Sequence, residues 1–295
     1  MRRLLPALLL LAAPVVASDD EAAIDALFKD RAPSIVCVKF VLTISFNMGG
    51  ENQKREQNSE VRGVIIDASG LVMLANDHLG AVPQRALAAI RARGGTIEAT
   101  PSAVKVLFGN EAKEHDAVIV ARDSNLNIAF VQILDLEKRE VTCVDLAKPA
   151  EAKIGSALLG VTRMGRGFDC APRFGRVLIT GRVEKPRAMW AVASNFDGLG
   201  LPVFDTAGGV VGVLASQEGS EGVDEGDAFG GGGNDGVFLL PLASVQGTID
   251  QAKKLAPDKV KKALAEKAEA AEAPAEKPAD EPAAPEGEGG EKDDR

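Results

Sequence analysis

Apolar residues between positions 35 and 241 fall in short runs rich in Val, Ile and Leu, separated by polar or Gly-containing turns. Short runs of this composition at close spacing are typical of β-strands. The pattern predicts roughly ten to twelve strands, few helices and no repeat of fixed period, which indicates an all-β barrel or sandwich. The strand-like runs are SIVCVKFVLTISF, VRGVIID, GLVMLAN, AVKVLF, DAVIVARD, NIAFVQIL, GSALLGVTRMG, GRVLITGRVEK, AMWAVAS, VVGVLAS and GVFLLPL.

Helical periodicity is confined to a few segments. EAAIDALFKDR places Ile24, Leu27 and Phe28 on one face. PQRALAAIRARGG predicts a helix that stops at Gly94, and ASVQGTIDQAKKL predicts a helix that closes the domain. The continuation DQAKKLAPDKVKKALAEKAEAAE is expected to be helical only in part, with an interruption at Pro257. The polar stretch NMGGENQKREQNSE predicts an exposed loop.

The N-terminal end, residues 1–17, has the pattern of a secretory signal peptide. Two arginines precede an apolar run, and the small residues Val15 and Ala17 suit the positions before a signal-peptidase site. The run is shorter than the ~20 apolar residues that span a bilayer, which favours cleavage over anchoring. We therefore expect an exported protein, periplasmic or extracellular, with no membrane span after cleavage.

The C-terminal end is Ala, Glu, Lys and Pro with almost no large apolar residue. Such a segment cannot bury enough surface to offset the entropy of ordering it, so we expect disorder from about residue 271. The sequence is thus divided into a signal peptide (1–17), a folded domain (18–254) and a tail (255–295) that is partly helical and then disordered.

Charge and residue counts exclude several classes of function. The formal net charge of −9 argues against nucleic acid and anionic membranes as partners. Two histidines, and three cysteines (Cys37, Cys143 and Cys170) with no metal-ligand spacing, predict no metal and no cofactor. Export permits disulfides, and both one pair plus a free thiol and three free thiols fit the odd count.

The acidic, Gly-rich segment 216–236 contains six carboxylates, which are ligands that Ca²⁺ prefers. It lacks the full spacing of an EF-hand loop, so a solvated surface loop is the preferred interpretation.

Several motifs, in order, resemble the Deg/HtrA (high-temperature-requirement) peptidases. They are VRGVIIDASGLVMLANDHLGA, ARDSNLNIAFVQI, IGSALLGVTRMG, FGRVLITGRV, GLGLPVFDTAGGVVGVLA and DGVFLLPLASVQGTIDQAKK, which lie between residues 61 and 254. The likeness as a whole spans about residues 33 to 254. The resemblance implies a trypsin-like double six-stranded β-barrel with a few short helices. The PDZ domains usual in the family are not expected after this barrel.

The resemblance also implies where the catalytic groups would lie, and two of the three are substituted. His78 matches the catalytic His, whereas Asn127 stands at the Asp position and Leu199 at the Ser position. Leu has no nucleophilic atom, and Asn carries no charge to stabilise an imidazolium. The oxyanion-hole positions are Asp197, Gly198 and Leu199, and the family has Gly where Asp197 and Leu201 stand. At least one of Leu199 and Leu201 is expected to fold inward and fill the cleft.

Other nucleophiles fit the pattern poorly. Ser194 precedes the turn, Thr206 lies in the following hairpin, and Cys170 lies in a separate loop. None of them has the Gly-containing elbow that presents a nucleophile.

We therefore expect a catalytically inactive, exported domain that binds or scaffolds a polypeptide, with loops 83–93 and 216–236 as candidate surfaces. Two alternatives remain open. One is an active serine-type endopeptidase with a non-standard site in envelope protein quality control, and the other is a structural envelope protein. The partner and the oligomeric state are not fixed by the sequence.

Overall fold

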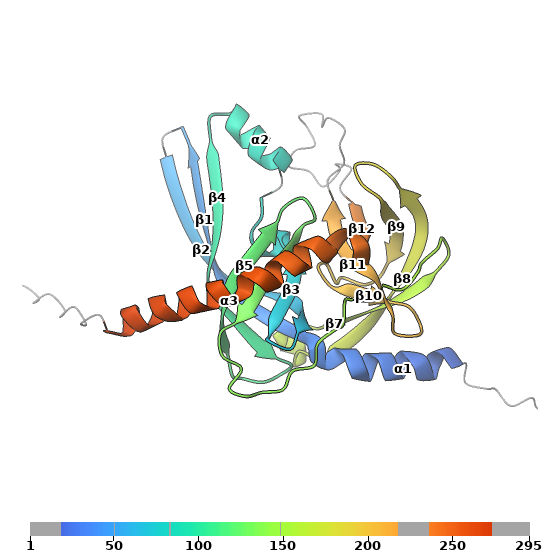
Figure 1. Ribbon diagram of the computed structural model, residues 1–295. Helices are drawn as coiled ribbons and strands as arrows, with labels where there is room; N and C mark the ends of the chain where they lie inside the picture. Colours follow the sequence, from blue (N-terminus) through green and yellow to red (C-terminus); the bar gives the residue numbers. More distant parts are fainter. Residues whose placement is uncertain (1–18, 50, 83, 148, 218–235, 273–295) are drawn as a thin grey trace, which may run out of the picture.

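Two closed six-stranded antiparallel barrels make up the protein (Figure 1), as the sequence predicts. The computed structural model describes residues 19–49, 51–82, 84–147, 149–217 and 236–272. The strands are connected in the order β1-β2-β3-β6-β5-β4 in the first barrel and β10-β11-β12-β9-β8-β7 in the second. The predicted signal peptide and the tail beyond Glu272 lie outside the described residues, as does most of the acidic segment.

The N-terminal barrel contains a long hairpin that the sequence does not predict. Its strands are β1 (Ile35–Met48), β2 (Glu51–Asp67), β3 (Leu71–Ala75), β4 (Thr96–Phe108), β5 (His115–Asp123) and β6 (Ile128–Ile133). The expectation of a loop over residues 47–60 is wrong, because β2 pairs with β1 from Glu51 opposite Met48 onward. The side chains of residues 51–58 are exposed. The outer part of β2 has no alternating apolar residues. Its backbone hydrogen bonds to β1, which also pairs with β4, keep it in the sheet.

The C-terminal barrel follows the predicted runs closely. Its strands are β7 (Ala157–Arg163), β8 (Pro172–Val183), β9 (Met189–Ser194), β10 (Pro202–Phe204), β11 (Val210–Gln217) and β12 (Gly236–Pro241). Strand β10 has three residues, too few for a periodic signal, and the sequence alone does not predict it.

Strands β3 and β6 are buried on both faces, which explains their unbroken apolar sequences. Val72 and Leu74 of β3 point into the N-terminal barrel, whereas Met73 joins the core that continues into the second barrel. In β6, Phe130 lies in that shared core and Val131 lies inside the first barrel. Alternation along each strand therefore fills one barrel and the layer between barrels at the same time.

Three α-helices surround the barrels. Helices α1 (Asp19–Arg31) and α2 (Gln84–Ala92) lie where the periodicity places them, and Gly94 stops α2 at a φ of +73°. Helix α3 (Leu242–Glu272) corrects the expected interruption, since it continues through Pro257. No helix among the described residues is long and apolar enough to cross a membrane.

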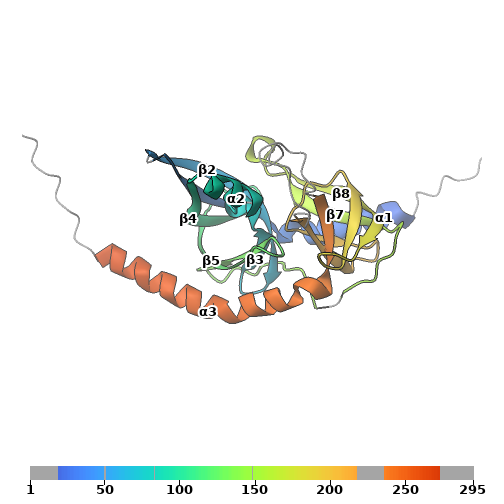
Figure 2. The ribbon, with the colours of Figure 1, turned by 90° about the horizontal axis from the view of Figure 1, so that it is seen from above.

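Helix α3 joins the two barrels (Figure 2). Val245 and Ile249 are buried in the shared core, and the helix then runs along the N-terminal barrel. There the Thr248 hydroxyl donates to Asp123 at 3.0 Å, and Lys253 pairs with Asp67 at 3.2 Å. Contacts along the barrel surface compensate for the one backbone hydrogen bond that Pro257 removes.

Candidate functional site

The three positions implied by the protease resemblance meet where the barrels join. His78 lies in the short 3-10 turn Asp77–Leu79 after β3, and Asn127 lies in the turn between β5 and β6 at a φ of 56°. Leu199 lies in the turn between β9 and β10. The Asn127 amide donates to Ser216 O on β11 at 3.3 Å, which ties its turn to the C-terminal barrel.

Gly200 brings the turn of Leu199 against the strand that leads to His78. A Cβ atom at Gly200 would overlap the backbone of Leu74 and Ala75, and the φ of +78° also favours glycine. The absence of a side chain here therefore permits close approach between the two barrels at the site.

The Asn127 side chain binds Asp77 rather than His78. Its Oδ1 accepts from the Asp77 N–H at 2.8 Å, and its Nδ2 donates to Asp77 Oδ2 at 2.9 Å. The other oxygen of Asp77 accepts from the His78 backbone N–H at 2.8 Å. The Asp and Asn side chains thus satisfy each other and the turn backbone.

The imidazole of His78 lacks the partner that a catalytic base needs. His78 Nδ1 is buried, and it has no hydrogen-bond partner in the part of the chain that the structure describes. In a Ser-His-Asp triad a carboxylate accepts from this nitrogen, fixing the tautomer and stabilising the imidazolium. The geometry therefore removes both contributions, beyond the loss of charge at position 127.

The turn at the nucleophile position has no group that could attack a carbonyl. Leu199 is half-buried, and the N–H of the next residue, Gly200, donates to Leu214 O at 2.7 Å. Leu201 is fully buried in the apolar core that both barrels share. Asp197, at an oxyanion-hole position, is exposed and pairs with Arg173 of β8.

Phe196, which the sequence does not single out, anchors this turn. The side chain is 6% exposed, and Cβ atoms at Gly160, Gly175 or Gly198 would overlap it or press against it. Three glycines thus make room for one ring. The only sequence signal is the small residue at these strand and turn positions, and nothing local links them to Phe196. Asp77 was missed for a similar reason, since its partner is 50 residues away.

Two of the three alternative nucleophiles contact other groups, and the third is exposed in a turn. The Ser194 hydroxyl accepts from the Phe196 N–H at 2.8 Å and lies 3.3 Å from Phe196 O. Thr206 is exposed in the turn between β10 and β11. The sulfur of Cys170 lies 3.8 Å from the sulfur of Cys37, and both belong to a small apolar cluster with Leu107.

One group of side chains among the described residues has donor atoms close enough for a metal ion: Cys37, Glu60 and Cys170, within 4.8 Å of one another. Both oxygens of Glu60 already face arginines, with Arg62 at 3.0 Å and Arg166 at 3.3 Å. This carboxylate is therefore a poor metal ligand.

Comparison with known proteins identifies the fold. No protein-family model matches the sequence, and no curated protein matches it. The structure of Deg5 is similar at 14% identity and a TM-score of 0.48, covering 77% of this chain and 92% of that chain. The HtrA-type protease AlgW with decapeptide is similar at 14% identity and a TM-score of 0.55, covering 78% of this chain and 67% of that chain. The fold is therefore that of the trypsin-like, HtrA-type proteases.

Proposed function

We propose that this protein is an exported, catalytically inactive domain of HtrA-type fold that acts by binding polypeptide. The observation that carries the proposal is the state of His78: its buried Nδ1 has no partner among the described residues. The side chain that should orient it, Asn127, is bonded to Asp77.

The nucleophile position supports the same conclusion independently. Acyl transfer requires an attacking hydroxyl or thiol and donors aimed at the developing oxyanion. Leu199 supplies no such atom. The N–H of the neighbouring Gly200 is held by Leu214 O, so it is not free to serve as an additional donor. A protease needs an attacking nucleophile, an oriented imidazole and a charge that stabilises the imidazolium, and we propose that this chain lacks all three.

Polypeptide is the ligand class we propose, and the loops are the surface. AlgW, which has a similar fold, was solved with a decapeptide, which makes an extended peptide the first ligand to test. Because Leu201 is buried between the barrels, we place binding outside the old cleft. Helix α2 directly follows the His78 turn and presents Arg91 to solvent. Export rests on the pattern of residues 1–17.

The test uses the full chain without its signal sequence and a fluorescently labelled, permanently unfolded protein. We expect fluorescence anisotropy to rise with added protein while gel electrophoresis shows no fragments. Arg91→Glu should weaken binding several-fold. Arg55→Glu, the same charge change at an exposed position on the β1/β2 hairpin, should not.

Two results would contradict the proposal in different ways. Fragments that disappear in a His78→Ala variant would show an active protease. An unchanged anisotropy with unfolded proteins of both acidic and basic composition would exclude polypeptide binding and leave a structural role.

A further inference from the structure

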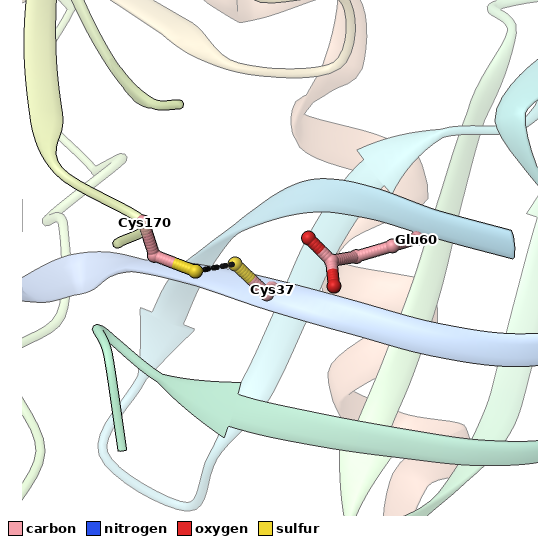
Figure 3. Close-up of side chains that lie close together, drawn as sticks. All are labelled: Cys37, Glu60 and Cys170. Carbon is pink, nitrogen blue, oxygen red and sulfur yellow. Dashed lines mark hydrogen bonds between the residues drawn. The ribbon is translucent and has the colours of Figure 1, made fainter. Parts of the chain in front are cut away.

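Cys37 and Cys170 bring two thiols together across the boundary between the barrels. Cys37 lies on β1, and Cys170 lies in the connection between β7 and β8, 133 residues later. The sulfurs are 3.8 Å apart and point toward one another (Figure 3). A disulfide needs the sulfurs at about 2 Å, so its formation requires side-chain rotation and a shift of one segment.

The segment that carries Cys170 can make that shift more easily than β1. Strand β1 is paired on both sides, with β2 and with β4. The connection contains only the 3-10 turn Arg166–Phe168, and Phe168 is 67% exposed. Asp169 and Cys170 both have positive φ angles, which non-glycine residues rarely adopt. Movement is therefore expected on the Cys170 side.

The charges around the pair favour a disulfide over a metal site. Besides its contact with Glu60, Arg62 donates to Arg163 O at 3.1 Å and to Met164 O at 2.8 Å. Arg163 donates to Cys170 O at 3.0 Å and to Ile35 O at 2.7 Å. These two guanidinium groups would repel a divalent cation.

We infer that Cys37 and Cys170 are a modification site at which an external disulfide oxidant forms a bond between the two barrels. The oxidant is a low-molecular-weight disulfide or the disulfide of an oxidoreductase. Cys143 is outside this pair and stays a free thiol. The inference does not depend on whether the protein binds polypeptide.

Cys170 is the sulfur that the oxidant reaches first. It is 5% exposed and adjoins exposed residues, whereas Cys37 is 0% exposed. Burial also raises the pKa of the Cys37 thiol to about 12, an effect that Arg62 offsets only in part. Cys37 is therefore a poor nucleophile toward a reagent in solution, and it reacts only with the neighbouring sulfur.

The reaction proceeds in two exchanges. Cys170 loses its proton and attacks one sulfur of the oxidant, forming a mixed disulfide and releasing one thiol. Cys37 then loses its proton and attacks the Cys170 sulfur, which breaks the mixed disulfide and releases the second thiol. Two protons and two electrons pass from the cysteine pair to the oxidant. Closing a loop of this length constrains the unfolded chain.

The test is a tryptic peptide map of the full chain without its signal sequence, after equilibration with oxidised glutathione at neutral pH. Remaining thiols are alkylated in denaturant, and bound zinc is measured on the same sample. We expect peptide 32–39 to be linked to peptide 167–173, with Cys143 alone alkylated. Cys143→Ser should keep the link. Cys170→Ser should abolish it and leave Cys37 unmodified in the folded protein.

Three results would overturn the inference. They are alkylation of all three cysteines after oxidation, a disulfide that involves Cys143, and stoichiometric zinc that protects the two thiols. A higher urea midpoint for the oxidised protein than for the reduced protein, present in Cys143→Ser and lost in Cys170→Ser, would support it further.

Discussion

Asn127 uses both ends of its amide on Asp77, and its Nδ2 also donates to Ser216 O. His78 Nδ1 has no hydrogen-bond partner among the described residues. The pair also fixes the turn, because Asp77 accepts from the His78 backbone. At the scale of single residues, Asp77 and Asn127 form a hydrogen-bond network that fixes the turn of His78.

Replacing Asn127 by Asp tests this network. The change puts a carboxylate oxygen where an amide now donates to Asp77, so two carboxylates would be in contact. We expect the free energy of unfolding to fall by about 1–3 kcal/mol at pH 7. Urea unfolding at pH 7 measures it.

A matched double variant controls for backbone effects. Asp adopts the positive φ of this turn as readily as Asn does, so strain is not the expected cause. Adding Asp77→Asn to Asn127→Asp exchanges the two groups and should restore most of the lost stability. An Asn127→Asp variant as stable as the native protein at pH 7 would show that the pairing contributes little.

The order of the motifs predicted that His78, Asn127 and Leu199 lie near one another. In the structure they lie in turns that adjoin one another. It did not reveal Asp77 or Phe196. Both act through partners distant in the chain: Asp77 through Asn127, and Phe196 through Gly160 and Gly175. Such pairings depend on tertiary packing, which no local pattern encodes.

At the scale of elements, the turn that carries Leu199 is held by its fit against β3. Gly200→Ala would place a methyl group into the backbone of Leu74 and Ala75. We expect a loss of roughly 2–4 kcal/mol in the free energy of unfolding, from overlap together with the positive φ.

Gly208→Ala is the control for the effect of φ alone. Its φ of +84° is similar, but a Cβ there meets only Leu27 Cδ1 at 3.6 Å and the tip of Arg31. The expected loss is about 1–2 kcal/mol. Equal losses for the two variants would contradict close packing of the turn on β3.

The connection between β4 and β5 gives a pH-dependent test. Lys39 of β1 and Lys105 of β4 lie 2.7 and 3.0 Å from Glu114, and their hydrogen bonds lower the pKa of this carboxyl from 4.5 to about 2. A depressed pKa in the folded state stabilises the fold above pH 4.5, and this contribution is lost as the pH falls through about 2.

Glu114→Gln should therefore lower the urea midpoint at pH 7 by a small amount, because the group is at the surface, and this difference should vanish as the pH falls from 4.5 to 2. Glu140→Gln, an exposed position with no ion pair among the described residues, should leave the profile unchanged. If the urea midpoint falls identically below pH 4.5 in Glu114→Gln and in the native protein, the ion pairs of Glu114 contribute nothing to acid stability.

The sequence predicted the strands that are formed from buried apolar residues. It did not predict the strand segment that exists only because a neighbouring strand pairs with it. The runs of β3 and β6 are apolar on both faces because each faces two cores. The outer half of β2 is polar, and it is a strand only because β1 pairs with it. Helix α3 passes Pro257 because a barrel surface supports it. These outcomes depend on neighbours far along the sequence.

At the scale of the whole molecule, several contacts join the two barrels across their boundary. The shared core, helix α3 and the contacts of Arg62 and Arg163 all cross the boundary. In a protease this boundary holds the catalytic groups. Here it holds Asn127 bonded to Asp77, an imidazole whose Nδ1 has no partner among the described residues, and two leucines. The fold is that of trypsin-like proteases, and we propose that the catalytic chemistry is absent.

Covalent labelling with a fluorophosphonate tests that central claim most directly, because the reagent reports an activated serine whatever the substrate. The full chain without its signal sequence, its Leu199→Ser variant and trypsin are treated together, and intact masses are measured. We predict no adduct on the native protein. We also predict none on Leu199→Ser, because His78 still lacks a carboxylate partner, whereas trypsin is labelled fully. A stoichiometric adduct on the native protein that is lost in His78→Ala would contradict the account.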